Sequence, residues 1–311
     1  MKLFKPKFWS KDHLTTFSLL LLPLSFIVKL LFLLKITITT KTKFDLPIIC
    51  VGNIYIGGTG KTPLSIKIFE IISRLKRKPV IIRKFYKDHL DEINLIENKT
   101  KNIITNRSRK KAILYGINKN FDTIILDDGF QDYSIKKNLN ILCFNEKQLI
   151  GNGYTIPSGP LRQSLSSIEK CQIILFNGKK NKNFESKIKK INKNIAFFYF
   201  KYEPINITKF KNKNFLAFAV IGNPDNFFIL LYKHKIKVKK KISFPDHYQF
   251  SKKDLDNLVS EAKKNNLKLI TTEKDFFRFK KLKFKNINYL AIKLKLYDEK
   301  NFTNHLKKYL P

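Results

Sequence analysis

The sequence predicts an α/β protein built on a mostly parallel sheet. One observation is that short apolar runs recur along the first two thirds of the chain with helical or loop segments between them, which is the alternating order of a parallel sheet. Another is that a glycine-rich turn separates the first run from a segment of helical periodicity. The runs predicted as strands are 46–51, 79–83, 123–126, 140–144 and 173–176.

A Lys/Asn-rich stretch, 177–194, is read as a solvated connector or an exposed helix. Apolar runs and helix signals return after it and predict a second, smaller α/β unit. Strands are expected at 215–220, 267–271 and 289–294, and helices after Pro224, after the capping-box-like pair Ser251 and Asp254, and at 302–310. The predicted division is 1–38, 39–205 and 206–311.

The segment 1–38 is predicted to associate with a membrane. It is largely apolar from Leu14 to Leu34, but Pro23 and Lys29 interrupt it, and its longest uncharged stretch is shorter than the ~20 residues that span a bilayer. Lysines flank both ends, so a helix lying in the interface of an anionic membrane is favoured. A buried core helix remains the alternative. No small-residue cleavage site follows, so a secretory signal is not expected.

The composition limits the protein's class. A hydrophobic fraction of 43% excludes a disordered chain, and a net charge of +38 would suit nucleic acid or anionic lipid. Lysine, asparagine and isoleucine are spread evenly, however, as in the products of AT-rich genomes, and no nucleic-acid-binding motif is recognisable, so nucleic acid is not expected as a partner. Cys50, Cys143 and Cys171 lack CxxC spacing, which indicates a reducing cytoplasm without disulfides or zinc.

The most informative motif lies between the first predicted strand and its helix. In such a place backbone N–H groups and a helix N-terminus bind phosphates, with a lysine at the β- and γ-phosphates and a hydroxyl on Mg²⁺. Tyr55 stands where the usual pattern has its first glycine, and an ordinary glycine turn is the alternative. The predicted nucleotide-binding residues are Gly57, Gly58, Thr59, Gly60, Lys61 and Thr62.

Two further groups could carry chemistry. Asp127 and Asp128 end a predicted strand, where carboxylates of a nucleotide-binding protein hold Mg²⁺, although a turn or helix cap is the common role of such a pair. His247, in a predicted loop, could assist a carboxylate base, whereas a lone loop histidine is more often a surface residue. Together these motifs predict a P-loop NTPase-like domain that uses ATP and Mg²⁺.

The ordered motifs resemble those of the tetraacyldisaccharide 4'-kinases over nearly the whole chain. The matching segments are 8–9 (FW), 22–25 (LPLS), 51–63 (VGNIYIGGTGKTP), 91–92 (DE), 127–131 (DDGFQ), 151–153 (GNG), 157–162 (PSGPLR), 221–224 (IGNP), 244–248 (FPDHY) and 271–275 (TTEKD). The resemblance implies transfer of the γ-phosphate of ATP to the 4'-hydroxyl of an acylated lipid A disaccharide 1-phosphate, in lipopolysaccharide synthesis at the cytoplasmic face of the bacterial inner membrane.

The resemblance also assigns roles that local sequence cannot. It makes Asp91 the general base, paired with His247, although nothing local separates Asp91 from its acidic neighbours. It adds Glu92 and Gln131 to the magnesium shell beside Thr62, Asp127 and Asp128. It gives Arg162 a role in stabilising phosphate charge.

Three departures from the family pattern bear on the site. Lys84 stands in place of a glycine within 82–86, Gln163 in place of a glutamate after Arg162, and Asp132 in place of a histidine after Gln131. We expect the first to reshape the loop before Asp91 and the second to remove a charge partner of Arg162. The alternative function is another membrane-associated P-loop ATPase or GTPase.

Overall fold

The chain folds into two compact units in a computed structural model, which describes residues 6–11, 13–57, 60–86, 89–220, 224–245 and 248–310. The first unit comprises Met1–Lys84, Ser108–Lys201 and Leu296–Pro311, and the second comprises Phe85–Arg107 and Tyr202–Lys295. The chain therefore passes from one unit to the other four times. Residues 85–107 belong to the second unit although they lie early in the sequence, while the predicted division into three parts stays a prediction.

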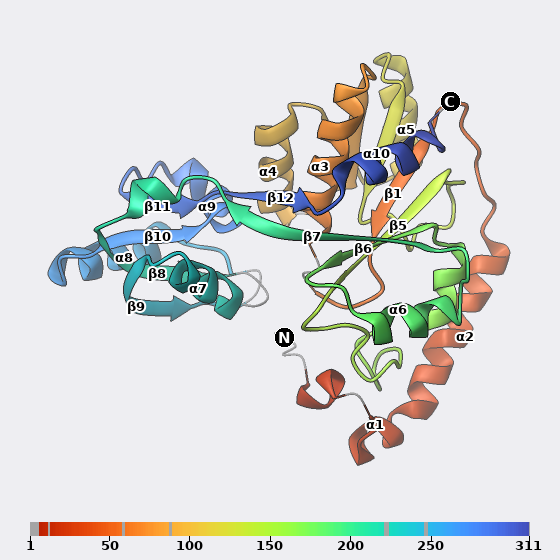
Figure 1. Cartoon of the computed structure of the whole chain (residues 1–311), viewed down its shortest axis with the longest axis horizontal. Helices are drawn as coiled ribbons and strands as arrows, with labels where there is room; N and C mark the ends of the chain where they lie inside the picture. The colour runs from red at the N-terminus through yellow and green to blue at the C-terminus, as the bar shows by residue number, and fades with distance from the viewer. Residues whose placement is uncertain are drawn as a thin grey trace. The chain divides into compact units, whose positions relative to one another are not determined.

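The first unit is a parallel sheet with helices (Figure 1). Six of its strands follow the order β7-β6-β5-β1-β4-β2, and every pairing among them is parallel. This confirms the predicted mostly parallel α/β class. The strands are β1 (Ile48–Gly52), β2 (Pro79–Lys84), β4 (Thr123–Asp127), β5 (Leu139–Asn145), β6 (Ile173–Asn177) and β7 (Ala196–Pro204), the last running on into the second unit.

These strands form where the sequence is richest in β-branched and other apolar residues. All five residues of β1 and of β4 are buried, as a strand covered on both faces requires. Helix α3 packs on β1, β2 and β4, and α10 lies beside it (Figure 1). The unit's helices are η1 (Lys7–Ser10), α1 (Thr16–Leu20), α2 (Leu22–Ile38), α3 (Lys61–Arg74), α5 (Arg109–Asn118), η3 (Leu165–Lys170), α6 (Lys182–Lys189) and α10 (Glu299–Lys307).

Helices α1 and α2 carry the predicted membrane-associating segment. Ser25, near the start of α2, is buried and joins it to the rest of the unit, because its hydroxyl donates to the carbonyl of Thr155 and accepts from the amide of Ser158, each at 2.9 Å. Much of the apolar surface faces outward, with Leu20 71% and Phe26 64% exposed. Within the described ranges no helix has the length and apolar character to cross a bilayer. Membrane association therefore stays a prediction.

The second unit contains a smaller parallel sheet in the order β11-β10-β8-β9. The strands of this sheet are β8 (Asn214–Ala219), β9 (Lys237–Ser243), β10 (Lys268–Thr272) and β11 (Ile287–Leu290). Residues of the unit also form β3 (Ile103–Asn106) and β12 (Ile292–Leu296), which lie outside this sheet, and β12 returns to the first unit. Its helices are α4 (Leu90–Thr100), η4 (Ile207–Phe210), α7 (Pro224–Lys233), α8 (Lys252–Lys264), α9 (Glu273–Phe279) and η5 (Lys280–Leu282). The second predicted α/β unit is thus present.

One detail of this unit differs from the sequence-based expectations and another matches them. The single strand expected at 289–294 is two strands, β11 and β12, which are separated at Ala291. The amide of Ala291 bonds to the side chain of Asn206, so the break is held by a polar contact that no local pattern reveals. The capping box of α8 is present, because Ser251 and Asp254 bond reciprocally.

Candidate active site

The predicted phosphate-binding loop joins the end of β1 to the start of α3 in the first unit. Gly57 and Gly60 have φ angles of 107° and 92°. Residues with a side chain rarely adopt such backbone angles, so both positions require glycine. The buried amide of Asn53 donates to the carbonyls of Tyr55 and Gly57 and so holds the loop. Tyr55 has no positive φ and instead forms a β-bridge with Leu161, which explains why no glycine is needed there. Gly58 and Thr59 lie outside the described residues.

Lys61 and Thr62 open α3 beside the end of β4. The Lys61 ammonium donates to Asn53 Oδ1 at 3.1 Å and lies 3.6 Å from the carboxylate of Asp128. The hydroxyl of Thr62 donates to Asp127 at 3.2 Å. The structure therefore brings the predicted lysine, hydroxyl and paired carboxylates together, although the loop and the acidic pair are more than 60 residues apart in sequence.

Asp127 is fully buried and its carboxylate is extensively bonded. It accepts hydrogen bonds from Thr62 and, at 2.8 Å, from the hydroxyl of Ser65. It also forms an ion pair with Arg83, which is itself 3% exposed and lies beside it in the register of β2 and β4. Arg83 thus neutralises a carboxylate that would otherwise be buried with two neutral donors only.

Asp128 is contacted by three cationic side chains, Lys61, Arg162 and Arg109. Besides Lys61, the guanidinium of Arg162 lies 3.3 Å from its carboxylate. Its backbone has a φ of 54°, a region that a non-glycine residue enters at a cost, and Arg109 donates to its carbonyl at 2.6 Å. Arg109 in turn pairs with Asp132 at 3.3 Å. Burial raises the pKa of Asp132, but bonds from Ser134 and the charge of Arg109 outweigh it and hold this pKa below its ordinary value.

The structure shows the surroundings of the three departures from the family pattern. Asp132 is an ion-pair partner of Arg109, and Arg162 has an acidic partner in Asp128 although residue 163 is not a glutamate. The amide of Gln163 donates to the hydroxyl of Tyr133 at 3.0 Å. Lys84 ends β2 without a positive φ, so it occupies the position of the family's glycine without strain there.

The oxygens of Thr62, Asp127 and Asp128 fit a magnesium site of the nucleotide-binding type. Mg²⁺ is commonly held by one or two carboxylates together with substrate phosphates and water, so a dedicated cage is not required. The described part of the chain contains no group of three or more histidine, cysteine or acidic side chains placed to hold a metal. Gln131, also predicted as a ligand, lies at the loop and donates to the carbonyl of Asn53 at 2.8 Å.

The predicted base lies in the second unit, at the start of α4. Asp91 is 2% exposed, and one of its oxygens accepts from Arg278 at 2.6 Å. Glu92, a predicted magnesium ligand, is bonded to Lys274 at 2.7 Å and lies 3.5 Å from the Nδ1 atom of His89. Burial lowers the pKa of Lys274, but the carboxylates of Glu92 and Asp91 outweigh it and raise this pKa, so Lys274 is a cation. His247 lies outside the described residues.

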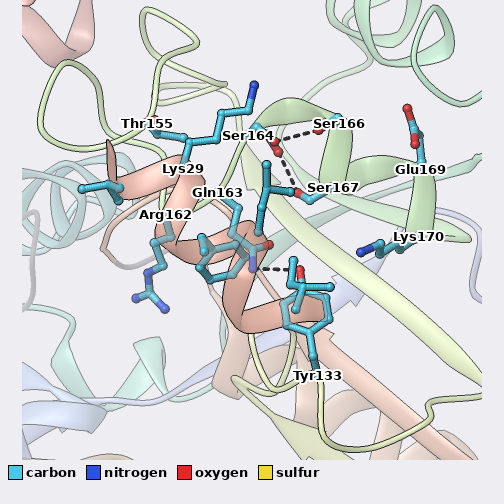
Figure 2. A pocket seen from close by; sticks show the side chains of 14 residues that line it. Lys29, Tyr133, Thr155, Arg162, Gln163, Ser164, Ser166, Ser167, Glu169 and Lys170 are labelled. Carbon is cyan, nitrogen blue, oxygen red and sulfur yellow. Dashed lines mark hydrogen bonds between the residues drawn. The ribbon is translucent and has the colours of Figure 1, made fainter. Parts of the chain in front are cut away.

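A pocket of about 180 Å³ lies in the first unit between α2 and the segment 155–170. Figure 2 shows it lined by Tyr133 and Gln163, which are joined by a hydrogen bond, and by Ser164, Ser166 and Ser167. Apart from Lys29, its α2 side is apolar, and its lining holds three cations, Lys29, Arg162 and Lys170, and one carboxylate, Glu169. The pocket therefore combines an apolar wall with positive charge.

Sequence comparison places the chain among known proteins. A family model described as tetraacyldisaccharide-1-P 4'-kinase matches residues 17–311. The chain belongs to this family. The tetraacyldisaccharide 4'-kinase of Pelagibacter ubique is 43% identical over 99% of this chain and 98% of its own length. That of Rickettsia akari is 32% identical over 95% and 94%. Membership makes the protein a kinase, a phosphotransferase with a hydroxyl group as acceptor.

The fold agrees with this membership. The solved structure of LpxK from Aquifex aeolicus in complex with ATP matches with a TM-score of 0.73 over 95% of this chain and all of that one, at 21% identity. The structure also adds residues that the sequence did not single out, namely Arg83, Arg109 and Arg278. Arg83 lay within the motif around 82–86, but no sequence signal distinguished Arg109 or Arg278 from the chain's many other cations.

Proposed function

We propose that this protein transfers the γ-phosphate of ATP, bound with Mg²⁺, to the 4'-hydroxyl of the acylated lipid A disaccharide 1-phosphate, a step of lipopolysaccharide synthesis. The observation that carries the proposal is the assembly of Lys61 and Thr62 with Asp127 and Asp128, in a chain whose family is named for this acceptor. The ATP in the related Aquifex structure supports the choice of donor.

The residues of the first unit provide the charge that phosphoryl transfer requires. In the loose transition state negative charge is spread over the oxygens of the transferred group and develops on the leaving oxygen, so fixed cations and N–H groups lower the barrier. Lys61 and Arg162 both contact Asp128, and a nucleotide phosphate at the loop would take over these cations from that carboxylate. Mg²⁺, held by Thr62 and the paired carboxylates, would neutralise the β- and γ-oxygens.

Asp91 of the second unit is the residue that we propose to act on the acceptor hydroxyl. We assign Asp91 the role of general base that orients the 4'-hydroxyl and receives its proton, with His247 as its partner and Glu92 and Gln131 as further magnesium contacts. The pocket's apolar wall and bordering cations, Lys29 among them, suit an amphiphile that carries both acyl chains and a phosphate.

We place the enzyme at the cytoplasmic face of the bacterial inner membrane. The outward apolar side chains of α1 and α2, including Phe17 at 70% exposure, support contact with lipid, because monomeric soluble proteins rarely expose large contiguous apolar patches. The excess of lysine would favour an anionic lipid surface. The enzyme could then bind an amphiphilic acceptor whose acyl chains stay in the membrane.

The proposal is tested by following transfer from γ-labelled ATP with Mg²⁺ to purified disaccharide 1-phosphate in mixed micelles. Wild type should label the lipid, and Lys61→Ala should reduce the rate by at least about 10²-fold, since a charge placed for the transition state is removed. Asp122→Asn, which changes a partly exposed carboxylate that bonds to Lys78 and Thr123 in the same unit, serves as the control and should retain the rate. Nucleotide hydrolysis without lipid labelling by folded wild type would instead indicate an ATPase or GTPase.

A further inference from the structure

The segment 271–275, which the family resemblance singles out without a role, continues into α9 and contacts the helix that carries the proposed base. Within the second unit, α4 and α9 are joined by several polar links. Glu92 bonds to Lys274 at 2.7 Å, Lys99 to Glu273 at 2.6 Å, and the amide of Asn94 to the carbonyl of Phe277 at 3.2 Å. This explains why residues 85–107 belong with the C-terminal half of the chain.

Arg278, near the end of α9, makes the contact that involves Asp91 itself. Its Nη2 atom donates to Asp91 Oδ2 at 2.6 Å, and both side chains are 2% exposed. Its Nη1 atom donates to the backbone carbonyl of Tyr248 at 3.3 Å. Tyr248 directly follows His247 in sequence, so one guanidinium connects the side chain of Asp91 to the segment that carries its predicted partner.

The arrangement distinguishes the two oxygens of Asp91. Oδ2 is held by Arg278, with Lys274 at 3.6 Å, whereas the buried Oδ1 has no hydrogen-bond partner among the described residues. A planar guanidinium with directed donors fixes the orientation of a carboxylate in a way that a flexible ammonium cannot. Oδ1 is therefore the oxygen that Arg278 and Lys274 leave without a partner in the described part of the chain.

Building on the function proposed above, we infer that Arg278 is a positioning residue of the kinase. It fixes the orientation of the Asp91 carboxylate through Oδ2, and it holds the segment following His247 through Tyr248. Arg278 contacts neither nucleotide nor acceptor in this role, and it acts on the rate only through the base.

Steady-state kinetics of Arg278→Gln test the inference. We expect kcat to fall by about 10²-fold, because small displacements of a reacting group have effects of this size, while KM for ATP and for the lipid changes by less than about threefold. Arg278→Lys keeps the charge and should recover about tenfold of the loss. Lys99→Met removes an ion pair between the same two helices away from Asp91 and leaves the buried carboxylate of Glu273 without it. As the control for a purely structural effect it should lower the stability but keep the kcat of the folded enzyme within about twofold.

A double-mutant cycle with Asp91→Asn separates positioning from a general structural effect. If Arg278 acts through Asp91, then Arg278→Gln should cause little further loss in the Asp91→Asn background, because the group that it positions is already inactive. Should Arg278→Gln fail to fold, the same cycle is measured with Arg278→Lys, whose loss should likewise vanish.

Two results would overturn the inference. One is that the losses from the Asp91 and Arg278 changes multiply; the other is that Lys99→Met lowers kcat as much as Arg278→Gln does. Both presuppose that wild type phosphorylates the lipid. A folded but inactive wild type would instead contradict the proposed function itself. Failure of the inference about Arg278 and failure of the proposed function therefore give different results.

Discussion

At the scale of single residues, the buried pair of Arg83 and Asp127 is central to the nucleotide site. Asp127 has no solvent exposure, and its only charged partner in the described contacts is the guanidinium of Arg83. Taking one partner from a buried pair leaves an uncompensated charge, which costs about 3–5 kcal/mol, whereas replacing both is often nearly neutral. The pair therefore serves the fold as well as the chemistry.

We accordingly expect Arg83→Met to lower the free energy of unfolding by about 3–5 kcal/mol, measured by urea denaturation followed by circular dichroism. The double variant Arg83→Met/Asp127→Asn should recover much of the loss, because the stranded charge is gone. A single variant as stable as wild type would show that Asp127 does not depend on Arg83.

The residue scale also shows how far sequence reasoning reaches into the site. Lys61, Thr62, Asp127 and Asp128 were predictable because a short motif between a strand and a helix, and a strand that ends in acid, each have a local pattern. Arg278 was not, because its role depends on a contact 187 residues away in sequence. In a chain with 62 lysine and arginine residues, no local pattern marks one of them as paired with a particular carboxylate.

At the scale of elements, α10 shows how the C-terminus is held to the first unit. Glu299 at its start bonds to Lys67 of α3 at 2.7 Å and also pairs with Arg74. Further along, His305 packs edge-on against Phe198, with ring centroids 5.7 Å apart. Partial burial, and then the charge of Lys308, lower the pKa of this histidine.

This lowered pKa gives α10 a pH dependence of defined sign. The unfolded chain binds a proton at His305 more readily than the native one, so the contribution of His305 is present above the unfolded pKa of about 6.5 and is lost as pH falls through the lower native pKa. The urea midpoint of wild type should therefore decrease between pH 7.5 and 5.5 more than that of His305→Gln. Equal decreases would contradict this assignment; because the ring is partly exposed, the expected difference is small.

Elements differ in how well the sequence predicts them. The strands β1, β4, β5 and β6 were predictable because each is an apolar run buried in a sheet. Strand β9 was missed because it lies at the edge of the smaller sheet and its sequence, KVKKKIS, is mostly lysine. Pairing with β8 stabilises β9 as a strand although lysine has a low preference for strands. This stabilisation comes from tertiary structure, so no local sequence pattern predicts it.

At the scale of the whole molecule, the proposed contact with an anionic lipid surface rests on the net charge of +38 and on the apolar surface of α1 and α2. We expect the protein to bind vesicles containing phosphatidylglycerol, with affinity that falls as salt rises because the charges are screened. Sedimentation with vesicles at two salt concentrations measures this.

A pair of variants separates the apolar contribution from the charge. Phe26→Ser/Leu31→Ser on α2 should weaken vesicle binding at least about tenfold, since each large apolar side chain that moves from water into lipid contributes about 1.5–3 kcal/mol to binding. Leu114→Ser/Tyr115→Ser on α5 changes apolar side chains of similar exposure, 52% and 54%, and should have little effect. Equal effects of the two pairs would mean that α2 is not the lipid contact.

Locating the phosphate in the product decides whether this chain phosphorylates the 4'-hydroxyl of a lipid A disaccharide. Phosphorus NMR of lipid incubated with wild type, ATP and Mg²⁺ should show a second monophosphate ester coupled to the proton at position 4', and Asp91→Asn should form it far more slowly. A product carrying its new phosphate elsewhere, or none at all from a folded protein that binds ATP, would contradict the account.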